Sequence, residues 1–350
     1  MTNSTMTARE RVFRALEFNR PDRVPRDLWM VPRAAMVYGQ DAIDAFCRRW
    51  PGDFVQAMVG RRPPLRAKGS PVEVGQYTDE WGCVFETVVA GIHGQVKDPL
   101  VSDWSKLDEV RPPEELLEVD GGAVRDFCRN TDRFVLGSGW ARPFERLQFL
   151  RGTENVLMDL GERSGELRQL LGLIHDFFRR QFEIWAGTAV DALVIMDDWG
   201  SQQSLLISPR LWREWFKPLY AEYASIAHAG GKKLFMHSDG YILDIYEDLI
   251  EVGVDAVNSQ LFCMDLAAIG ARCAGRIAFW GEIDRQQVLP HGTVADVRAA
   301  VARVVEHLWR PEGGVIAQFE LSADTPLENA HAVYESWERL TAAAPLSLNP

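Results

Sequence analysis

The hydrophobic pattern of the chain changes near residue 130. Beyond that point, short apolar runs rich in β-branched residues alternate with amphipathic stretches of helical length. The predicted strands are 134–137, 189–196, 233–237, 256–259, 277–280 and 315–319. Because the strands at 233, 256 and 277 recur at the tight spacing of strand–helix units, we expect a parallel sheet covered by helices.

The first 130 residues are less regular. A short amphipathic helix over 8–18 leads into Pro21 and Pro25, which end it and force extended backbone. Alternating residues over 79–86 indicate a strand or hairpin, within what we interpret as a cap over one end of the fold. The length best fits a (β/α)8 TIM barrel, with six regular βα units in 131–350 and two further strands within an irregular N-terminal extension, 1–130.

An open doubly wound sheet is the alternative architecture. No Gly-x-Gly-x-x-Gly follows an early strand, which weakens the phosphate-binding version of that fold.

The net charge of the chain limits the kinds of molecule that it is expected to bind. The 38 basic and 50 acidic residues give a net charge of −12, which disfavours binding to nucleic acid. No apolar run is long enough for a membrane span, and the charged N-terminus lacks a signal peptide pattern, so we expect a cytoplasmic protein. The five widely spaced cysteines are an odd number, which disfavours a disulfide framework.

Polar residues follow most of the predicted strands, where a TIM barrel carries its active site. They are Asp197, Asp198, His237, Asp239, Cys263, Glu282 and Glu320. Taken singly, each is also explained as a helix cap, a hydrogen-bonded loop residue or a buried thiol. Their convergence on one barrel end favours a site, and a cation would relieve the repulsion among the carboxylates.

Imidazole, thiolate and carboxylate together suit Zn²⁺. His237, Cys263 and Glu320 provide three ligands from neighbouring strands and leave a fourth position open, although no Cys-x-x-Cys strengthens the pattern. Tryptophans are abundant, and Trp29, Trp140 and Trp199, with Trp81, are candidates for an apolar wall around a substrate. Each of them is equally well explained by core packing.

The chain resembles the uroporphyrinogen decarboxylase superfamily over nearly its whole length. The resemblance rests on Arg9-Glu10-Arg11-Val12, Pro21-Asp22-Arg23-Val24-Pro25, Asp198-Trp199-Gly200, His237-Ser238-Asp239-Gly240, Gly281-Glu282-Ile283-Asp284 and Asp324-Thr325-Pro326-Leu327-Glu328-Asn329. It implies a (β/α)8 barrel whose site lies at the C-terminal ends of the strands.

The superfamily includes two chemistries. Its decarboxylases use no cofactor and bind an acidic porphyrinogen through an Arg-Gln-Ala-Gly-Arg pattern, which the stretch 26–36 lacks. Its corrinoid-dependent methyltransferases that act on thiols hold zinc through a His-x-Cys…Cys set. Here Asp239 and Glu320 stand where the two cysteines would fall, and oxygen ligands of this kind suit a substrate that leaves through oxygen.

The resemblance therefore implies a zinc-dependent methyltransferase that moves a methyl group from a small methoxylated substrate, aromatic substrates included, to a corrinoid carried by a partner protein. We expect Asp197, Glu282 and Asp239 to serve catalysis, with Asp239 either a ligand or a residue that orients His237. A monomer or homodimer is expected. The alternatives are a cofactor-free decarboxylase, a transferase from methylcorrinoid to an acceptor, and a binding protein without turnover.

Overall fold

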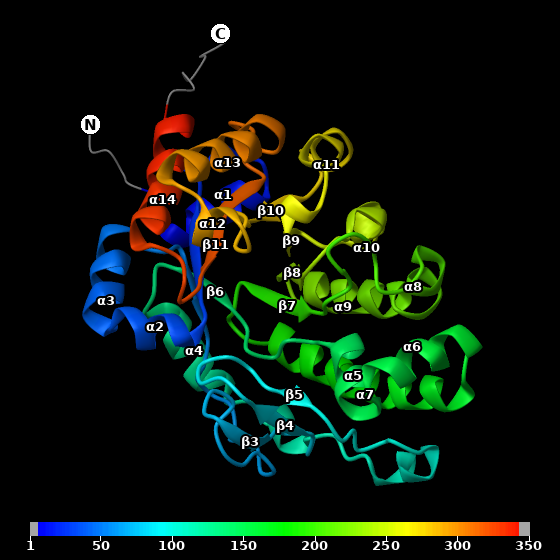
Figure 1. The fold of residues 1–350 in the computed structure, drawn as a ribbon. Helices are drawn as coiled ribbons and strands as arrows, with labels where there is room; N and C mark the ends of the chain where they lie inside the picture. The colour runs from blue at the N-terminus through cyan, green and yellow to red at the C-terminus, as the bar shows by residue number, and fades with distance from the viewer. Residues whose placement is uncertain (1–5, 343–350) are drawn as a thin grey trace.

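A computed structural model describes residues 6–342, and its centre is a ring of eight parallel strands (Figure 1). The strands follow one another around the ring in the order β1-β11-β10-β9-β8-β7-β6-β2. They are β1 (Arg26–Met30), β2 (Phe54–Gln56), β6 (Phe134–Leu136), β7 (Ala192–Met196), β8 (Lys233–Ser238), β9 (Ala256–Ser259), β10 (Ala278–Trp280) and β11 (Val315–Leu321). The backbone N–H of Asp53 donates to the carbonyl of Arg26 at 2.8 Å, which links the first two strands across the remaining gap.

This arrangement confirms the predicted (β/α)8 barrel in place of an open sheet. All six strands expected beyond residue 130 are present, and the other two lie in the N-terminal third, as predicted. The helices surround the ring (Figure 1). They are α1 (Ala8–Leu16), α2 (Pro32–Tyr38), α3 (Gln40–Arg49), α4 (Gly121–Arg129), α5 (Pro143–Arg151), α6 (Thr153–Glu162), α7 (Gly165–Ala186), α8 (Pro209–Trp215), α9 (Lys217–Ala229), α10 (Tyr246–Val252), α11 (Leu266–Cys273), α12 (Val288–His291), α13 (Val294–His307) and α14 (Leu327–Thr341).

Short 3-10 helices and a small sheet complete the fold. The 3-10 helices are η1 (Trp104–Glu109), η2 (Glu114–Leu117), η3 (Leu243–Ile245) and η4 (Leu261–Cys263). The small antiparallel sheet consists of β3 (Gly75–Thr78), β4 (Val84–Thr87) and β5 (Gln95–Val96). The predicted hairpin is thus real, and Asp79 shapes its turn by accepting the backbone N–H groups of Trp81 and Cys83.

Two hydrophobic layers separate the inside of the barrel from its outer shell. In β8, Leu234 and Met236 pack into the shell under the helices, whereas Phe235 packs inside the barrel with Phe134 and Trp280. Successive side chains of a strand point to opposite faces, so His237 shares the inner face with Phe235. It is the last inward residue of β8 and therefore lies at the mouth of the barrel.

The N-terminal end of the barrel is closed. Val12 and Leu16 of α1 belong to the inner hydrophobic cluster. Beside them, the buried carboxylate of Asp53 accepts from Arg11 at 2.6 Å, from Arg23 at 2.8 Å and from the backbone N–H of Arg26 at 2.7 Å. All five cysteines are free thiols. Among the described residues, no helix combines the length and the apolar character needed to cross a membrane.

Candidate active site

His237 is held in one orientation at the barrel mouth. Its Nδ1 lies 2.6 Å from Oδ1 of Asn258, the residue opposite it on β9. The amide nitrogen of Asn258 donates to Gln318 at 3.0 Å and to the carbonyl of Trp280, so its oxygen is the acceptor for His237. The Nδ1 atom therefore carries a proton, and Nε2 is left to face the opening of the barrel.

Two carboxylates face this nitrogen. The Nε2 atom of His237 lies 3.4 Å from Oδ1 of Asp198 and 3.6 Å from Oδ1 of Asp239. Within residues 6–342, these three side chains form the group whose ligand atoms are close enough together to share a metal ion. The backbone N–H of Asp239 donates to Asp198 at 2.8 Å, while the buried Oδ1 of Asp239 has no hydrogen-bond partner.

The pKa values of His237 and Asp198 depend on their mutual charges as well as on burial. Burial opposes the charged form of His237, but the hydrogen bond and charge of Asp198 and the charge of Asp239 outweigh it and raise the pKa of His237 to about 9. Burial likewise acts to raise the pKa of Asp198, yet its contact with His237 lowers that pKa overall. Without a bound metal, the cluster therefore holds a charged imidazolium at neutral pH.

Arg285 contacts carboxylates at the ends of three strands, β8, β10 and β11. Its Nη1 donates to Glu320 at 3.0 Å, its Nη2 donates to Oδ2 of Asp239, and its Nε lies 3.4 Å from Glu282. Burial disfavours the guanidinium charge, but Glu282, Asp239 and Glu320 outweigh burial and raise the pKa of Arg285. One fixed cation thus balances three acidic residues.

Glu282 is the most deeply buried of these three acidic residues. Only 2% of the residue is exposed, and burial raises its pKa to about 8 against the opposing charge of Arg285. The carboxyl group is therefore mostly protonated at neutral pH. Glu282 lines a cavity of about 290 Å³. It is therefore positioned to donate a proton to a molecule bound in this cavity.

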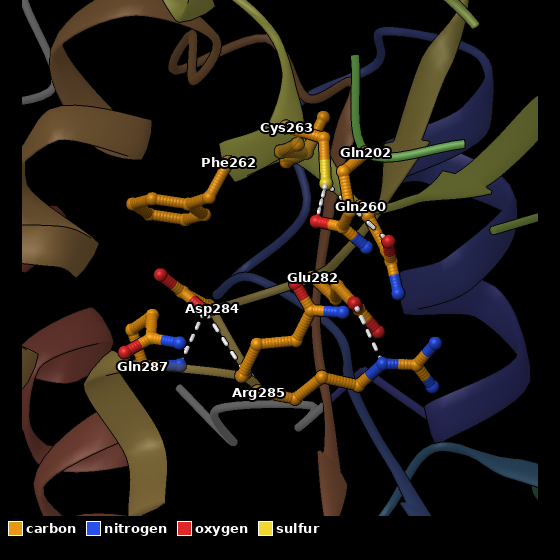
Figure 2. A pocket seen from close by; sticks show the side chains of 10 residues that line it. Gln202, Gln260, Phe262, Cys263, Glu282, Asp284, Arg285 and Gln287 are labelled. Atoms are coloured by element: carbon orange, nitrogen blue, oxygen red, sulfur yellow. Dashed lines mark hydrogen bonds and ion pairs between the residues drawn. The ribbon is translucent and has the colours of Figure 1, made fainter. Parts of the chain in front are cut away.

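Cys263 lies on the opposite side of the same cavity. Figure 2 shows its thiol directed toward the side-chain oxygens of Gln202 and Gln260, at 3.4 and 3.3 Å. Burial, followed by the charges of Asp284 and Glu282, raises the pKa of this thiol, so it stays protonated. Without a metal ion, the thiol therefore acts as a hydrogen-bond donor to two amide oxygens.

The predicted ligand set is therefore only partly brought together. His237 joins the carboxylate cluster, whereas Cys263 and Glu320 are not part of it. The reason is local in both cases. Cys263 ends the 3-10 helix η4, where its thiol donates a hydrogen bond to an amide oxygen. Glu320 accepts a hydrogen bond from Arg285.

Asp197 and Trp199 lie behind the mouth in the core, although we expected them to serve catalysis and substrate binding. Asp197 is fully buried and accepts from the backbone N–H of Glu145, at the start of α5, and from the hydroxyl of Tyr220. Burial raises the pKa of Asp197 well above its ordinary value. Trp199 is also fully buried, stacked on Phe144 at 4.1 Å. Both residues hold helices against the barrel.

Trp29 and Trp140 are half-buried at the mouth. The ring of Trp29 lies 5.0 Å from His237 and 6.4 Å from Trp140. The indole N–H groups of Trp29 and Trp280 both donate to Asp27, at 3.1 and 2.8 Å. Burial raises the pKa of Asp27 to about 6. Trp81, in contrast, is almost completely buried in the core.

With this geometry in view, the family is clear. The family model of uroporphyrinogen decarboxylase matches residues 79–340. The chain belongs to the uroporphyrinogen decarboxylase family. No curated protein matches it.

A solved methyltransferase structure shares the fold of this family member. A methyltransferase from Methanosarcina mazei is similar with a TM-score of 0.67 and 16% identity, covering 96% of this chain and 99% of that one. The IOLI protein with a zinc atom is similar with a TM-score of 0.42 and 10% identity, covering 91% of this chain and 99% of that one. At these identities the first likeness concerns the fold.

The sequence pattern does not indicate every residue of this family member's site. Arg285 lies one residue beyond the Gly281–Asp284 motif, but nothing in the sequence indicates that it reaches three carboxylates. Asn258 carried a usable signal, since it precedes the end of a predicted strand and has the parity of an inward residue. Asp198 was counted among the strand-end carboxylates, but its closeness to His237 required the folded barrel.

Proposed function

We propose that this protein is a methyltransferase that takes the methyl group of a small methoxylated substrate, preferably an aromatic one, and passes it to a corrinoid carried by a partner protein. The proposal rests on the buried carboxyl of Glu282, whose pKa burial raises to about 8, in a cavity that adjoins a cluster of nitrogen and oxygen ligands through Arg285. Methyl ethers leave through oxygen, which needs a proton or a Lewis acid. Family membership and the fold shared with a methyltransferase support the same chemistry.

The donor set fits a divalent metal such as zinc. Nε2 of His237 and the facing oxygens of Asp198 and Asp239 are suitable ligands, and Oδ1 of Asp239 is buried without any hydrogen bond to satisfy it. A metal bound there would replace the proton on Nε2 and polarise the ether oxygen. The Asn258 contact keeps the metal-binding nitrogen of His237 oriented.

The chain's own residues would then do three things. Glu282 donates its proton to the leaving oxygen, which keeps the electron pair of the broken methyl–oxygen bond, while the methyl group passes to the reduced corrinoid. Trp29 and Trp140 form an aromatic wall against which the substrate ring packs. Arg285 balances the charge that Glu282 acquires when it loses its proton.

Metal content separates this ligand set from the one expected from the sequence. We expect about one zinc per purified chain by elemental analysis. His237→Ala and Asp239→Asn should lower the zinc content strongly, because each removes a direct ligand. The matched control is Cys263→Ser, which should keep its zinc. Loss of zinc in Cys263→Ser and retention in Asp239→Asn would instead support the ligand set of His237, Cys263 and Glu320.

Methyl transfer itself is tested with a corrinoid carrier protein reduced to cobalt(I). Incubation with 4-methoxybenzoate and related methoxyarenes should change the corrinoid absorbance to that of the methylated form and release the corresponding phenol. Absence of both products across a broad panel would overturn the proposal. Metal-independent release of CO2 from an acidic substrate would instead establish the decarboxylase alternative.

A further inference from the structure

One buried carboxylate inside the barrel has no role in the function proposed above. Asp27 is the second residue of β1, and only 9% of it is exposed. Its side chain shares the inner face of the strand with Trp29, two residues further on. No basic side chain of residues 6–342 forms an ion pair with Asp27. A carboxylate that is buried without a cation is costly, and groups of this kind concentrate at functional sites.

The side chains that donate to this carboxylate are two indoles. The N–H of Trp29 donates to Oδ2 of Asp27 at 3.1 Å, and the N–H of Trp280 donates to the same oxygen at 2.8 Å. The two rings are nearly perpendicular, at 89°, and their centroids lie 5.1 Å apart. Because an indole has a single N–H donor, each hydrogen bond fixes the direction in which that edge of the ring faces. One oxygen atom therefore sets the orientation of both rings.

Trp29 connects this anchor to the mouth of the barrel. Its ring lies 5.0 Å from that of His237 and 6.4 Å from that of Trp140. In the register of the sheet, Trp29 lies opposite Glu320 of β11. A rotation of the Trp29 ring would change the space in front of His237, and the hydrogen bond to Asp27 opposes that rotation.

Trp280 connects the same anchor to the end of β10. It is fully buried and is the last residue of that strand, and Glu282 follows it by two residues. The backbone carbonyl of Trp280 accepts from the amide nitrogen of Asn258, whose oxygen orients His237. The hydrogen bond to Asp27 thus holds the residue from which both the acid and the support of the imidazole depend.

We propose that Asp27 is a positioning residue that fixes the two indoles of the site, those of Trp29 and Trp280. Through Trp29 it keeps the aromatic wall beside His237 in one orientation. Through Trp280 it fixes the strand end that leads to Glu282. Asp27 does not line the cavity next to Glu282, so it acts through the indoles and not on a ligand. The effect on the reaction rests on the proposed function, whereas the anchoring of the indoles does not.

The first test follows the indole N–H groups by nuclear magnetic resonance of the whole protein, labelled with ¹⁵N in its tryptophans. Burial raises the pKa of Asp27 to about 6, so its charge forms as the pH rises from 5 to 7. The N–H signals of Trp29 and Trp280 should move downfield together over this interval, because a charged acceptor strengthens both hydrogen bonds. Trp29→Phe and Trp280→Phe assign the two signals. Trp140, whose N–H donates to the carbonyl of Gly137 at 2.9 Å, is the internal control and should not shift with them.

The groups around Asp27 allow this titration to be attributed to it. On β11 the neutral amide of Gln318 lies opposite Asp27, and on α14 the hydroxyl of Tyr334 donates to its backbone carbonyl at 2.8 Å. The negative charge of Asp53, just before β2, adds to the effect of burial on the pKa of Asp27. The pKa of His237 is raised to about 9, so its imidazole does not titrate between pH 5 and 7.

The second test compares two exchanges at this position. Asp27→Asn keeps an oxygen that accepts from both indoles but cannot titrate, so it should abolish the common pH dependence and lower the demethylation rate less than tenfold. Asp27→Leu removes the acceptor, and it should shift both N–H signals and lower the rate about 100-fold through the misplaced wall and strand end. Asp126→Leu, the same exchange at an exposed aspartate of α4, is the matched control and should change neither.

Separate titration of the two indole signals, or a common pH dependence that persists in Asp27→Asn, would overturn the anchoring. A rate in Asp27→Leu within twofold of the wild type would overturn the positioning role. If Asp27→Leu does not fold, Trp29→Phe decides this point, because it keeps a ring without the N–H and its rate should fall about tenfold. The proposed function fails separately: if the signals titrate together but no methoxyarene methylates the corrinoid, the anchoring stands and the methyltransferase assignment falls.

Discussion

Each end of the barrel holds a cluster of arginine and carboxylate side chains, and the two clusters differ in which group is shared. At the N-terminal end, one carboxylate, that of Asp53, accepts from Arg11, Arg23 and a backbone N–H. At the C-terminal end, one guanidinium, that of Arg285, serves Asp239, Glu282 and Glu320. Both clusters lie where the barrel strands begin or end, so position alone does not explain the difference.

The contrast shows how a structural cluster differs from a functional one. Both oxygens of Asp53 are occupied, so that cluster has nothing to offer a ligand. At the other end, an oxygen of Asp239 has no hydrogen-bond partner and the pKa of Glu282 is raised to about 8. Burial is the main cause of the raised pKa of Glu282, and perturbed groups in a cavity are typical of active sites.

The largest expected effect concerns the closed end. Asp53→Ala leaves Arg11, which is largely buried, and Arg23 without their shared carboxylate, and we expect it to lower the free energy of unfolding by about 3–5 kcal/mol. Urea denaturation followed by circular dichroism measures the change. The zinc content of the folded fraction should not change. A loss of under about 1 kcal/mol would show that the two clusters do not differ in structural importance.

The next effect concerns the acid at the open end. Glu282→Gln should reduce demethylation about 100-fold or more, because glutamine cannot donate the proton. In the wild type the rate should fall as the pH rises through about 8, since Glu282 then loses its proton. The pH–rate profile of the carrier assay measures this decline, and the variant should lack it.

The pH dependence of the stability of Glu282→Gln provides an independent control for the pKa of Glu282. The folded-state pKa of Glu282 lies above its unfolded value, so the wild type loses stability as the pH rises from about 4.5 to about 8. The glutamine variant has no charge to bury. Its stability relative to the wild type should therefore increase over this interval, as measured by denaturation at several pH values.

A smaller effect is expected from Arg285. Its charge lowers the pKa of Glu282, so Arg285→Gln should move the alkaline decline of the rate upward by about one pH unit. Arg285→Lys, which keeps a cation, should move it less. A decline that stays at the wild-type pH in Arg285→Gln would show that the arginine does not control the acid.

The smallest effect is expected at Cys263. Its thiol makes weak hydrogen bonds to two amide groups, and serine can replace it in both. Cys263→Ser should change the free energy of unfolding by under about 1 kcal/mol and should leave the demethylation rate within about twofold of the wild type. A large loss of rate would show that the thiol of Cys263 takes part in the reaction.

The sequence was informative where local pattern and tertiary role coincide. The strand 233–237 ends in a polar residue of the inward parity, and His237 lies at the mouth as expected. Asp197 and Trp199 follow the strand β7 by one and three residues, and both are buried in the core. Nothing local distinguishes a carboxylate that starts a site from one that holds the N-terminus of α5.

The sequence by itself determined the barrel and the end at which its polar residues gather. Alternation and strand–helix spacing are local properties, and they are sufficient for this. Only the tertiary structure decided which groups meet: Asp198 with His237, Arg285 with its three carboxylates, and Asp27 with Trp280. These pairs come from segments far apart in the chain, and their energies depend on burial and on distances that exist only once the barrel has closed.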